Sequence, residues 1–251
     1  MFLFNEKKCA DICLKNTNKY VFKAVNDLIS DFERVSTFGV KPKIVKNVTQ
    51  NCIIIEENTR TSAEPVADES YSITTENGNI VIRANGYLGT MWGIYTLSEK
   101  FLDVDPCYLF NDLAIVKKDA VELSEVDIAD KPDGFGFRGV FINDEDLLQG
   151  WKDCGGARLV GGGYYYVTVA KTVIKKVVET VLRLKLNLVI PATFSTLTTR
   201  LKKTLPTQLP SAEFIFRNTI ANRSAFRRSR LKIIAKNTEK PADFRTANAL
   251  K

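Results

Sequence analysis

Histidine is absent from all 251 residues of the chain. Without it the chain cannot build a Ser-His-Asp triad, a Cys-His pair or a His-ligated metal site. Long apolar runs are absent too, since none approaches the roughly 20 residues that cross a bilayer. The apolar start is interrupted by Glu6, Lys7 and Lys8, which argues against a signal peptide. The sequence therefore predicts no membrane partner, no metal and no cofactor.

Paired cysteine motifs are also missing. The five cysteines are an odd number and none of them forms a CxxC; they are Cys9, Cys13, Cys52, Cys107 and Cys154. This usage is typical of reduced thiols rather than of a disulfide scaffold. We expect a cytoplasmic protein.

Acidic residues are scarce in the last part of the chain. Residues 195–251 hold 13 Lys and Arg against 3 Asp and Glu, which leaves 23 basic and 26 acidic residues for 1–194. A basic tail is typical of nucleic-acid binding, and a solvated segment is the alternative. The basic residues are scattered and only Phe214, Phe216, Phe226 and Phe244 could stack on bases. No nucleic-acid partner is predicted.

The first 131 residues predict an α+β domain. Apolar spacing predicts a helix over 21–32 with Asn18 as its cap, and 51–57 reads as a short strand. Alternating residues on both sides of Asn77-Gly78 predict a β-hairpin with a type I′ turn over 69–84. Residues 86–102 predict a helix that glycines weaken, and the polar stretch 116–134 reads as a linker.

A strand, a helix and a second strand are predicted over 136–144, 171–185 and 186–194. This order indicates a βαβ unit with parallel strands. The stretch between the first strand and the helix, residues 155–167, reads as a loop rich in glycine and tyrosine. The fold class is α/β: an N-terminal α+β domain (1–131), the first βαβ unit of a truncated (β/α)8 barrel (132–194), and a disordered or non-native basic tail (195–251).

Polar residues gather where the first of these strands ends. Asn143, Asp144, Glu145 and Asp146 could bind sugar hydroxyls or serve acid/base chemistry, because ligands of such folds bind at the carboxyl ends of strands. Acidic residues also favour the start of a helix, and position alone leaves the two readings open.

Aromatic and basic residues near this strand have alternatives of their own. Tyr164, Tyr165 and Tyr166 could stack on a sugar or pack as a loop core. Trp92 and Trp151 are predicted to lie in the core, and Arg138 to be an ion-pair partner rather than a catalyst.

Several ordered blocks resemble glycoside hydrolase family 115, the xylan α-1,2-glucuronidases. They are Arg138 to Glu145, the tyrosines 164–166, Leu-Arg-Leu-Lys at 182–185, and Pro191-Ala192; upstream, residues 89–102 and 105–113 are similar to the family's N-terminal domain. The resemblance implies a (β/α)8 barrel that cleaves α-linked glucuronic acid from xylan, with Asn143, Asp144 and Glu145 in the substrate pocket and the catalytic residue unassigned. It implies a xylan-derived oligosaccharide as the partner of full-length members, which can be dimers.

After Phe194 the sequence expected of the family stops. The expected motifs are Leu-Asp-Phe-Asp-Asn-Pro and His-His-x-Glu-Pro-Leu-Gly. Both can be encoded in a shifted reading frame if synonymous codons are chosen to suit them, the first from residues 194–200 and the second from residues 216–226. We therefore expect an out-of-frame tail, an incomplete active site and an inactive chain. A non-catalytic module that binds carbohydrate or protein is the alternative.

Overall fold

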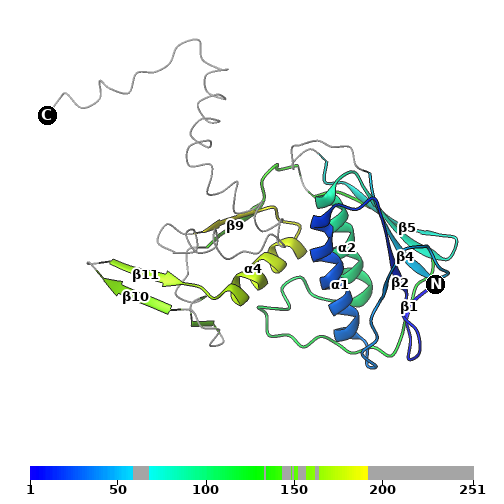
Figure 1. Ribbon diagram of the computed structural model, residues 1–251, viewed down its shortest axis with the longest axis horizontal. Helices are drawn as coiled ribbons and strands as arrows, with labels where there is room; N and C mark the ends of the chain where they lie inside the picture. The colour runs from blue at the N-terminus through cyan, green and yellow to red at the C-terminus, as the bar shows by residue number, and fades with distance from the viewer. Residues whose placement is uncertain are drawn as a thin grey trace, which may run out of the picture.

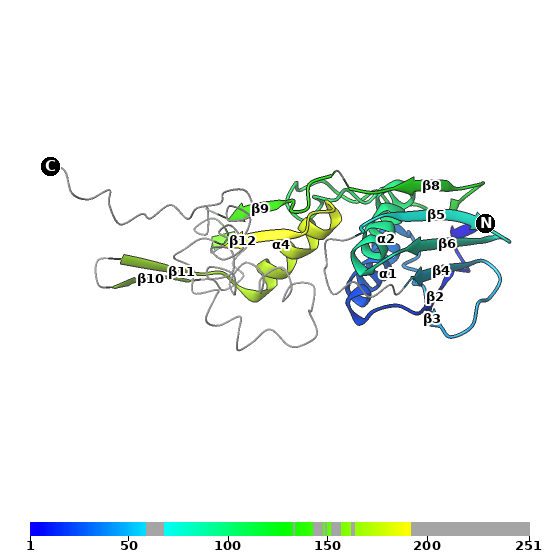
Figure 2. The same cartoon turned by 90° about the horizontal axis from the view of Figure 1, so that it is seen from above.

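Six strands form the central sheet in the first half of the chain (Figures 1 and 2). The computed structural model describes residues 1–58, 68–132, 134–142, 148, 150–151, 157–161 and 164–191. Across the sheet the strands run β3 (Ile44–Val45), β2 (Asp11–Lys15), β4 (Cys52–Glu57), β6 (Asn79–Ala84), β5 (Tyr71–Glu76) and β8 (Asp127–Asp130). The first four pair in parallel, and β5 and β8 join antiparallel.

Alternation along the strands divides the apolar side chains between the two faces of this sheet. In β4, Ile53 and Ile55 enter the main core, while Ile54 joins a smaller cluster on the other face. Successive residues of β6 divide in the same way, with Val81 in the smaller cluster. Because side chains of a strand point to opposite faces with a period of two, a run such as Ile53–Ile55 fits only a strand that is buried on both sides.

The predicted hairpin is confirmed. Strands β5 and β6 pair from Tyr71 opposite Ala84 to Glu76 opposite Asn79, which leaves a two-residue loop. Both loop residues, Asn77 and Gly78, have positive φ, at 50° and 76°. A type I′ turn requires this conformation at both positions, and asparagine and glycine adopt it at least cost.

Two helices cover one face of the sheet. The chain enters α1 (Phe22–Val35) through the short 3-10 helix η1 (Lys19–Val21), where the Asn18 side chain accepts a hydrogen bond from the Tyr20 amide at 3.2 Å. The predicted cap and helix are thus confirmed. The second helix, α2 (Tyr87–Leu102), is buried around most of its circumference because it lies between the sheet and further helices (Figure 1).

The polar stretch before residue 131 is more ordered than predicted. Rather than a linker throughout, it forms β7 (Val121–Glu122), which pairs with β1 (Phe2–Phe4), and β8, which pairs with β5. The linker prediction was wrong here because an edge strand needs few apolar residues. Ile128 opposite Ile73 supplies the apolar contact, and the other residues of β8 are exposed.

A parallel strand pair follows, as predicted. Strand β9 (Gly139–Ile142) pairs in parallel with β12 (Leu188–Pro191), and α4 (Lys171–Arg183) connects them. The loop predicted before this helix instead forms an antiparallel hairpin, β10 (Ala157–Gly161) and β11 (Tyr164–Thr168). In both ribbon views α1 and α2 lie between the six-stranded sheet and α4. Over the described residues, none of the helices is long and apolar enough to cross a membrane.

The glycines of α2 are explained by close packing. A Cβ atom at Gly89 would lie 2.6 Å from the carbonyl oxygen of Ser70, and one at Gly93 would lie 2.6 Å from the Ile82 side chain. Real Cβ atoms do not approach backbone oxygen so closely. The helix therefore accepts poor helix formers in order to reach the sheet.

We expect Gly89→Ala to destabilise the fold by about 1–3 kcal/mol, despite the better helix propensity of alanine, because the backbone of residues 69–70 must shift. Gly134→Ala is the control, since no atom lies within 4 Å of the position that its Cβ would take. That control should change the free energy of unfolding by less than about 0.5 kcal/mol in urea titrations. Equal effects of the two substitutions would contradict the packing argument.

Candidate active site

The carboxyl ends of β9 and β12 lie at one edge of the parallel pair. Ile142 stands opposite Pro191 in the register, and each is the last residue of its strand. The predicted site residues Asn143, Asp144 and Glu145 follow Ile142 directly in the chain, but they lie outside the described residues, as does Asp146. Ile142 itself is buried in the main core, at 8% exposure. The structure thus brings two parallel strand ends together, and the site residues stay a prediction.

The opposite edge of the strand pair is held by Arg138 and Asn187. The Arg138 guanidinium pairs with the Glu69 carboxylate and donates to the carbonyl oxygens of Phe135 at 2.7 Å and Lys185 at 3.1 Å. Asn187 donates to Glu69 at 2.9 Å and accepts from the Arg138 amide at 2.9 Å. The prediction that Arg138 is an ion-pair partner is confirmed. This cluster fastens the amino ends of the strands to the segment before β5.

A second cluster joins α4 to α1. Arg183, at the end of α4, has a side-chain exposure of 2% and lies 2.9 Å from the carboxylate of Asp31, which is fully buried in α1. The same guanidinium donates to Glu179 at 2.9 Å, one turn earlier in α4. Ser98 of α2 donates to Asp31 at 2.7 Å. Three helices therefore meet in one buried charged network.

Burial and charge act against each other in this network. Burial opposes the charge of Arg183, but the carboxylates of Asp31 and Glu179 outweigh it and raise its pKa. Burial also opposes ionisation of Glu179, yet Lys23 and Arg183 hold the pKa of that carboxyl below its usual range. Burial raises the pKa of Asp31, and Arg183 lowers it in part. Since the guanidinium stays charged at any ordinary pH, the 2.9 Å contact favours the ionised form of Asp31.

Lys185 makes a third anchor. Its ammonium donates to the Tyr71 hydroxyl at 2.8 Å and to Asp130 at 3.0 Å, and Tyr71 donates to Asp130 at 2.7 Å. Tyr71 and Asp130 lie on paired strands at the edge of the six-stranded sheet. The segment that ends α4 is thereby tied to the sheet as well as to the helices.

Comparison with known proteins finds a family match over part of the chain. Residues 130–214 match the sequence model of glycosyl hydrolase family 115. This region is similar to family 115. The matched range contains β9, α4 and β12, and it extends past Phe194 to residue 214. None of the curated proteins matches the chain.

A solved glycoside hydrolase of family 115 shares the fold, and other glycoside hydrolases are more distantly similar. The first, a 4-O-methyl-α-glucuronidase with specificity for decorated arabinogalactans, has a TM-score of 0.59 at 21% identity, over 82% of this chain and 28% of that one. A family 20 exo-β-N-acetylglucosaminidase from Vibrio harveyi has a TM-score of 0.45 at 17% identity, over 75% and 22% of the two chains. A chitobiase from Flavobacterium johnsoniae has a TM-score of 0.44 at 19% identity, over 75% and 31%. This chain thus spans about 28% of the length of the family 115 structure, and the likeness concerns the fold.

The motifs that resemble family 115 divide into two kinds. Arg183 and Lys185 belong to the Leu-Arg-Leu-Lys block, and both make docking contacts with α1 or the sheet. Arg138 makes the same kind of contact at the strand's amino end. The residues of the similarity that follow β9, Asn143 to Glu145, lie outside the described residues.

The aromatic candidates have mixed outcomes. Trp92 is fully buried, so its assignment to the core is confirmed; its indole donates to Glu69 at 3.3 Å. Trp151 is partly buried, with the Phe110 ring 5.2 Å away and the Lys176 ammonium 4.6 Å above it. Residues 164–166 lie on β11 rather than in a loop, and their side chains are outside the described part of the structure.

Asp31, Glu69 and Glu179 were missed by sequence reasoning. Each is a single carboxylate on an otherwise ordinary helix or segment. The partners of Asp31 and Glu69 lie far away in the chain. Glu179, besides Arg183 in its own helix, lies 3.5 Å from the Lys23 ammonium of α1. A buried polar position on the apolar face of α1, between Leu28 and Phe32, is the one signal that could have pointed to Asp31. Among the described residues, no group of three or more His, Cys, Asp or Glu could hold a metal.

We expect Arg183→Met to lower the free energy of unfolding by about 3–5 kcal/mol, because it leaves the Asp31 carboxylate buried without its partner. Arg34→Met is the matched control: Arg34 also pairs with Asp31, at 3.1 Å, but its side chain is 41% exposed. Loss of such a pair should cost less than about 1 kcal/mol. Adding Asp31→Asn to Arg183→Met should restore part of the loss. Similar urea midpoints for the two arginine variants would refute the proposed anchor.

Proposed function

We propose that residues 132–194 form the opening βαβ unit of a family 115-type glycoside hydrolase barrel, which acts on α-1,2-linked glucuronic acid side chains of xylan. One observation carries the proposal: the parallel pair of β9 and β12 lies inside the matched range and leads directly into Asn143, Asp144 and Glu145. Ligands of parallel α/β folds bind at this edge. The anchors at Arg138 and Asn187 occupy the other edge, so they leave the carboxyl ends free for chemistry.

The chemistry of these residues suits a sugar acid side chain. Carboxylates accept hydrogen bonds from sugar hydroxyls, and the asparagine amide can both donate and accept. Asp144 and Glu145 are therefore proposed to bind hydroxyl groups of the substrate, and Asn143 to orient it. The catalytic residue is not assigned among the three.

Hydrolysis requires more than this edge provides. Glycosidases use two carboxyl groups on either side of the scissile bond, about 5–9.5 Å apart, and in barrels such groups come from several strand ends. The described residues supply two parallel strands of this kind. We therefore expect the 251-residue chain by itself to bind substrate weakly and to be inactive.

Binding tests the proposed recognition. A xylo-oligosaccharide that carries glucuronic acid should bind more tightly than the undecorated oligosaccharide in calorimetric or NMR titration of the full chain. Glu145→Gln should raise the Kd for the decorated ligand about tenfold, as expected for the loss of one hydrogen bond to a charged group. Glu125→Gln, an exposed carboxylate before β8, serves as the control. A decorated arabinogalactan oligosaccharide replaces xylan as substrate if it binds more tightly.

Activity tests the incomplete site separately. We expect the purified chain to release no glucuronic acid from decorated xylan above the level of the Glu145→Ala variant. Release that depends on Glu145 would show that the chain holds a working acid/base pair, and it would overturn the proposed inactivity while supporting the substrate.

A non-catalytic binding module is the second candidate. The N-terminal sheet and its two helices contribute most residues of the main core, including the largest fully buried side chains, Trp92 and Tyr95. Binding of a neutral oligosaccharide or a protein that survives substitution of Asn143, Asp144 and Glu145 together would favour this candidate.

We further propose that the sequence after Phe194 is read out of frame. Its support is that synonymous codons exist for this amino-acid sequence that would encode two family motifs, in order, in a single shifted frame. The matched range extends to residue 214, so it does not mark Phe194 as the end of the similarity. The nucleotide sequence across the Phe194 codon should contain one insertion or deletion relative to an intact family gene. An uninterrupted frame that other family genes share would refute the proposal.

A further inference from the structure

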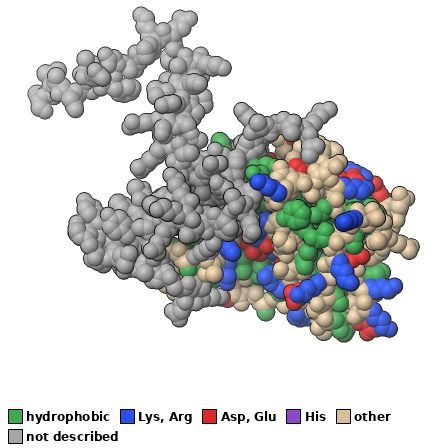
Figure 3. Space-filling view, viewed as in Figure 1, with side chains coloured by type: hydrophobic (Ala, Val, Ile, Leu, Met, Phe, Trp, Pro, Cys, Tyr) green, Lys and Arg blue, Asp and Glu red, His purple; other side chains and the backbone are tan. Residues whose placement is uncertain are grey.

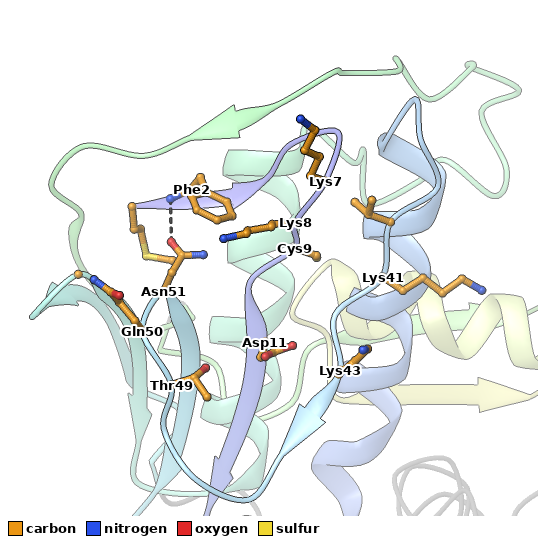
Figure 4. Close-up of a pocket in the computed structure, with 13 residues that line it drawn as sticks. Phe2, Lys7, Lys8, Cys9, Asp11, Lys41, Lys43, Thr49, Gln50 and Asn51 are labelled. Atoms are coloured by element: carbon orange, nitrogen blue, oxygen red, sulfur yellow. Dashed lines mark hydrogen bonds between the residues drawn. The ribbon is translucent and has the colours of Figure 1, made fainter.

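A cavity of about 860 Å³ opens beside the first strands of the sheet, far from β9 and β12 in the chain (Figure 4). It lies at the amino ends of β2 and β4, and its walls come from three connections: β1 to β2, α1 to β3, and β3 to β4. Nothing in the proposed glycosidase chemistry uses this cavity. Its volume is in the range of sites that hold small ligands, roughly 300–1,000 Å³.

Positive charge dominates the wall. Four lysines and one carboxylate line the cavity: Lys7, Lys8, Lys41, Lys43 and Asp11. Two of the lysines already have acidic neighbours outside it, since Lys41 lies 2.8 Å from Glu33 and Lys7 lies 3.4 Å from Glu6. Figure 4 shows Lys41 pointing away from the others. On the face of the molecule in Figure 3, by contrast, basic and acidic side chains are interspersed.

Lys8 and Lys43 are different. Within the described residues, neither ammonium makes an ion pair or a side-chain hydrogen bond. Lys8 comes from the β1–β2 connection and extends toward Asn51, while Lys43 enters from the α1–β3 connection (Figure 4). Two such ammonium groups from separate segments, beside one cavity, form a site of positive potential that an anion would neutralise.

The wall of the cavity also contains side-chain amides that can bind the hydroxyl groups of a ligand. The Asn51 carbonyl oxygen accepts from the Phe2 amide at 2.9 Å, which fixes the side chain and leaves its NH2 group to donate. Gln50 adds a second amide, and the ring of Phe2 lies beside Asn51 and Lys8 (Figure 4). Amides beside an aromatic ring can bind the hydroxyls and the apolar face of a sugar ring.

Covalent thiol chemistry is not expected in this cavity. Burial, and to a lesser extent Asp11, raises the pKa of Cys9 to about 12. The thiolate that would act as a nucleophile is therefore scarce at neutral pH. We therefore expect a ligand in this cavity to bind through non-covalent contacts.

We propose that this cavity binds a small anionic sugar, with Lys8 and Lys43 pairing with its carboxylate or phosphate and Asn51 and Gln50 donating to its hydroxyls. The site is independent of the proposed active site and does not need a barrel. Asp11 opposes the anion, so its carboxylate weakens binding and sets a moderate affinity.

The test uses the full 251-residue chain and three probes: glucuronate, glucose 6-phosphate and glucose. Titration by NMR or calorimetry should show binding of at least one of the two acidic sugars, weaker binding or none of glucose, and a loss of affinity with added salt. Glucuronate and glucose 6-phosphate distinguish a uronic acid from a sugar phosphate as the natural source. Equal binding of glucose and both acids, or no binding of any probe at millimolar concentration, would overturn the proposal.

Charge variants locate the site. Lys8→Gln with Lys43→Gln should raise the Kd at least about tenfold, because two charge-assisted contacts are lost. Asp11→Asn should lower the Kd about twofold or more, because a repulsive charge is removed. Lys8→Gln and Lys43→Gln are also measured singly, and the matched control for each is Lys100→Gln, which removes one positive charge on the exposed last turn of α2. If Lys100→Gln raises the Kd as much as a substitution of either pocket lysine, the affinity depends on the net charge of the protein and not on this cavity. That result would refute the site.

Two further measurements keep this result separate from the proposed function. The variant with Asn143, Asp144 and Glu145 all changed to alanine should bind the acidic sugar as the parent chain does. If that variant loses binding while the lysine variants keep it, the ligand occupies the barrel edge and the cavity proposal fails. Thermal midpoints within about 1–2 °C of the parent establish that the lysine variants are folded.

Discussion

The buried contact between Asp31 and Arg183 is the constraint on which the arrangement of the molecule depends. Two ions without water are stable only when they pair and their remaining hydrogen-bonding positions are filled. Glu179 and Ser98 fill them here, from α4 and α2, so the ion pair is satisfied only when three helices take one arrangement. We expect the ion pair to restrict the position of α4 against α1 and α2 more than apolar packing alone would.

That single position sets where chemistry can occur. Arg183 ends α4 and Lys185 follows it, so both fix the point at which the chain enters β12. Arg138 and Asn187 then tie the amino ends of both parallel strands to Glu69. Among the described residues these anchors lie at the amino ends of the pair, and Asn143, Asp144 and Glu145 follow the carboxyl end of β9 in the sequence. The two proposed ligand sites lie on different elements. The lysine-lined cavity is formed by the N-terminal sheet and its connections, and the proposed sugar site follows β9, which pairs with β12.

The sequence predicted correctly those features of the structure that depend on a few neighbouring residues. The turn at Asn77-Gly78, the cap at Asn18 and the apolar period of α4 follow from conformations available to a few neighbouring residues, and all three were predicted. Strand β8 was taken for linker, because an edge strand next to β5 needs only Ile128 to be apolar. The hairpin of β10 and β11 was taken for a loop. The resemblance found the right family region but did not reveal that Arg183 and Lys185 dock α4.

The sequence by itself determined the elements, the βαβ order and the polar residues that end the first strand, because periodicity, turn chemistry and adjacency in the chain act over short distances. Tertiary structure alone decided which carboxylate meets which guanidinium and which lysines share a cavity. Asp31 and Arg183 are 152 positions apart, and Lys8 and Lys43 come from separate connections. Such pairs depend on the packing of helices and strands in space, and spacing along the chain contains no record of it.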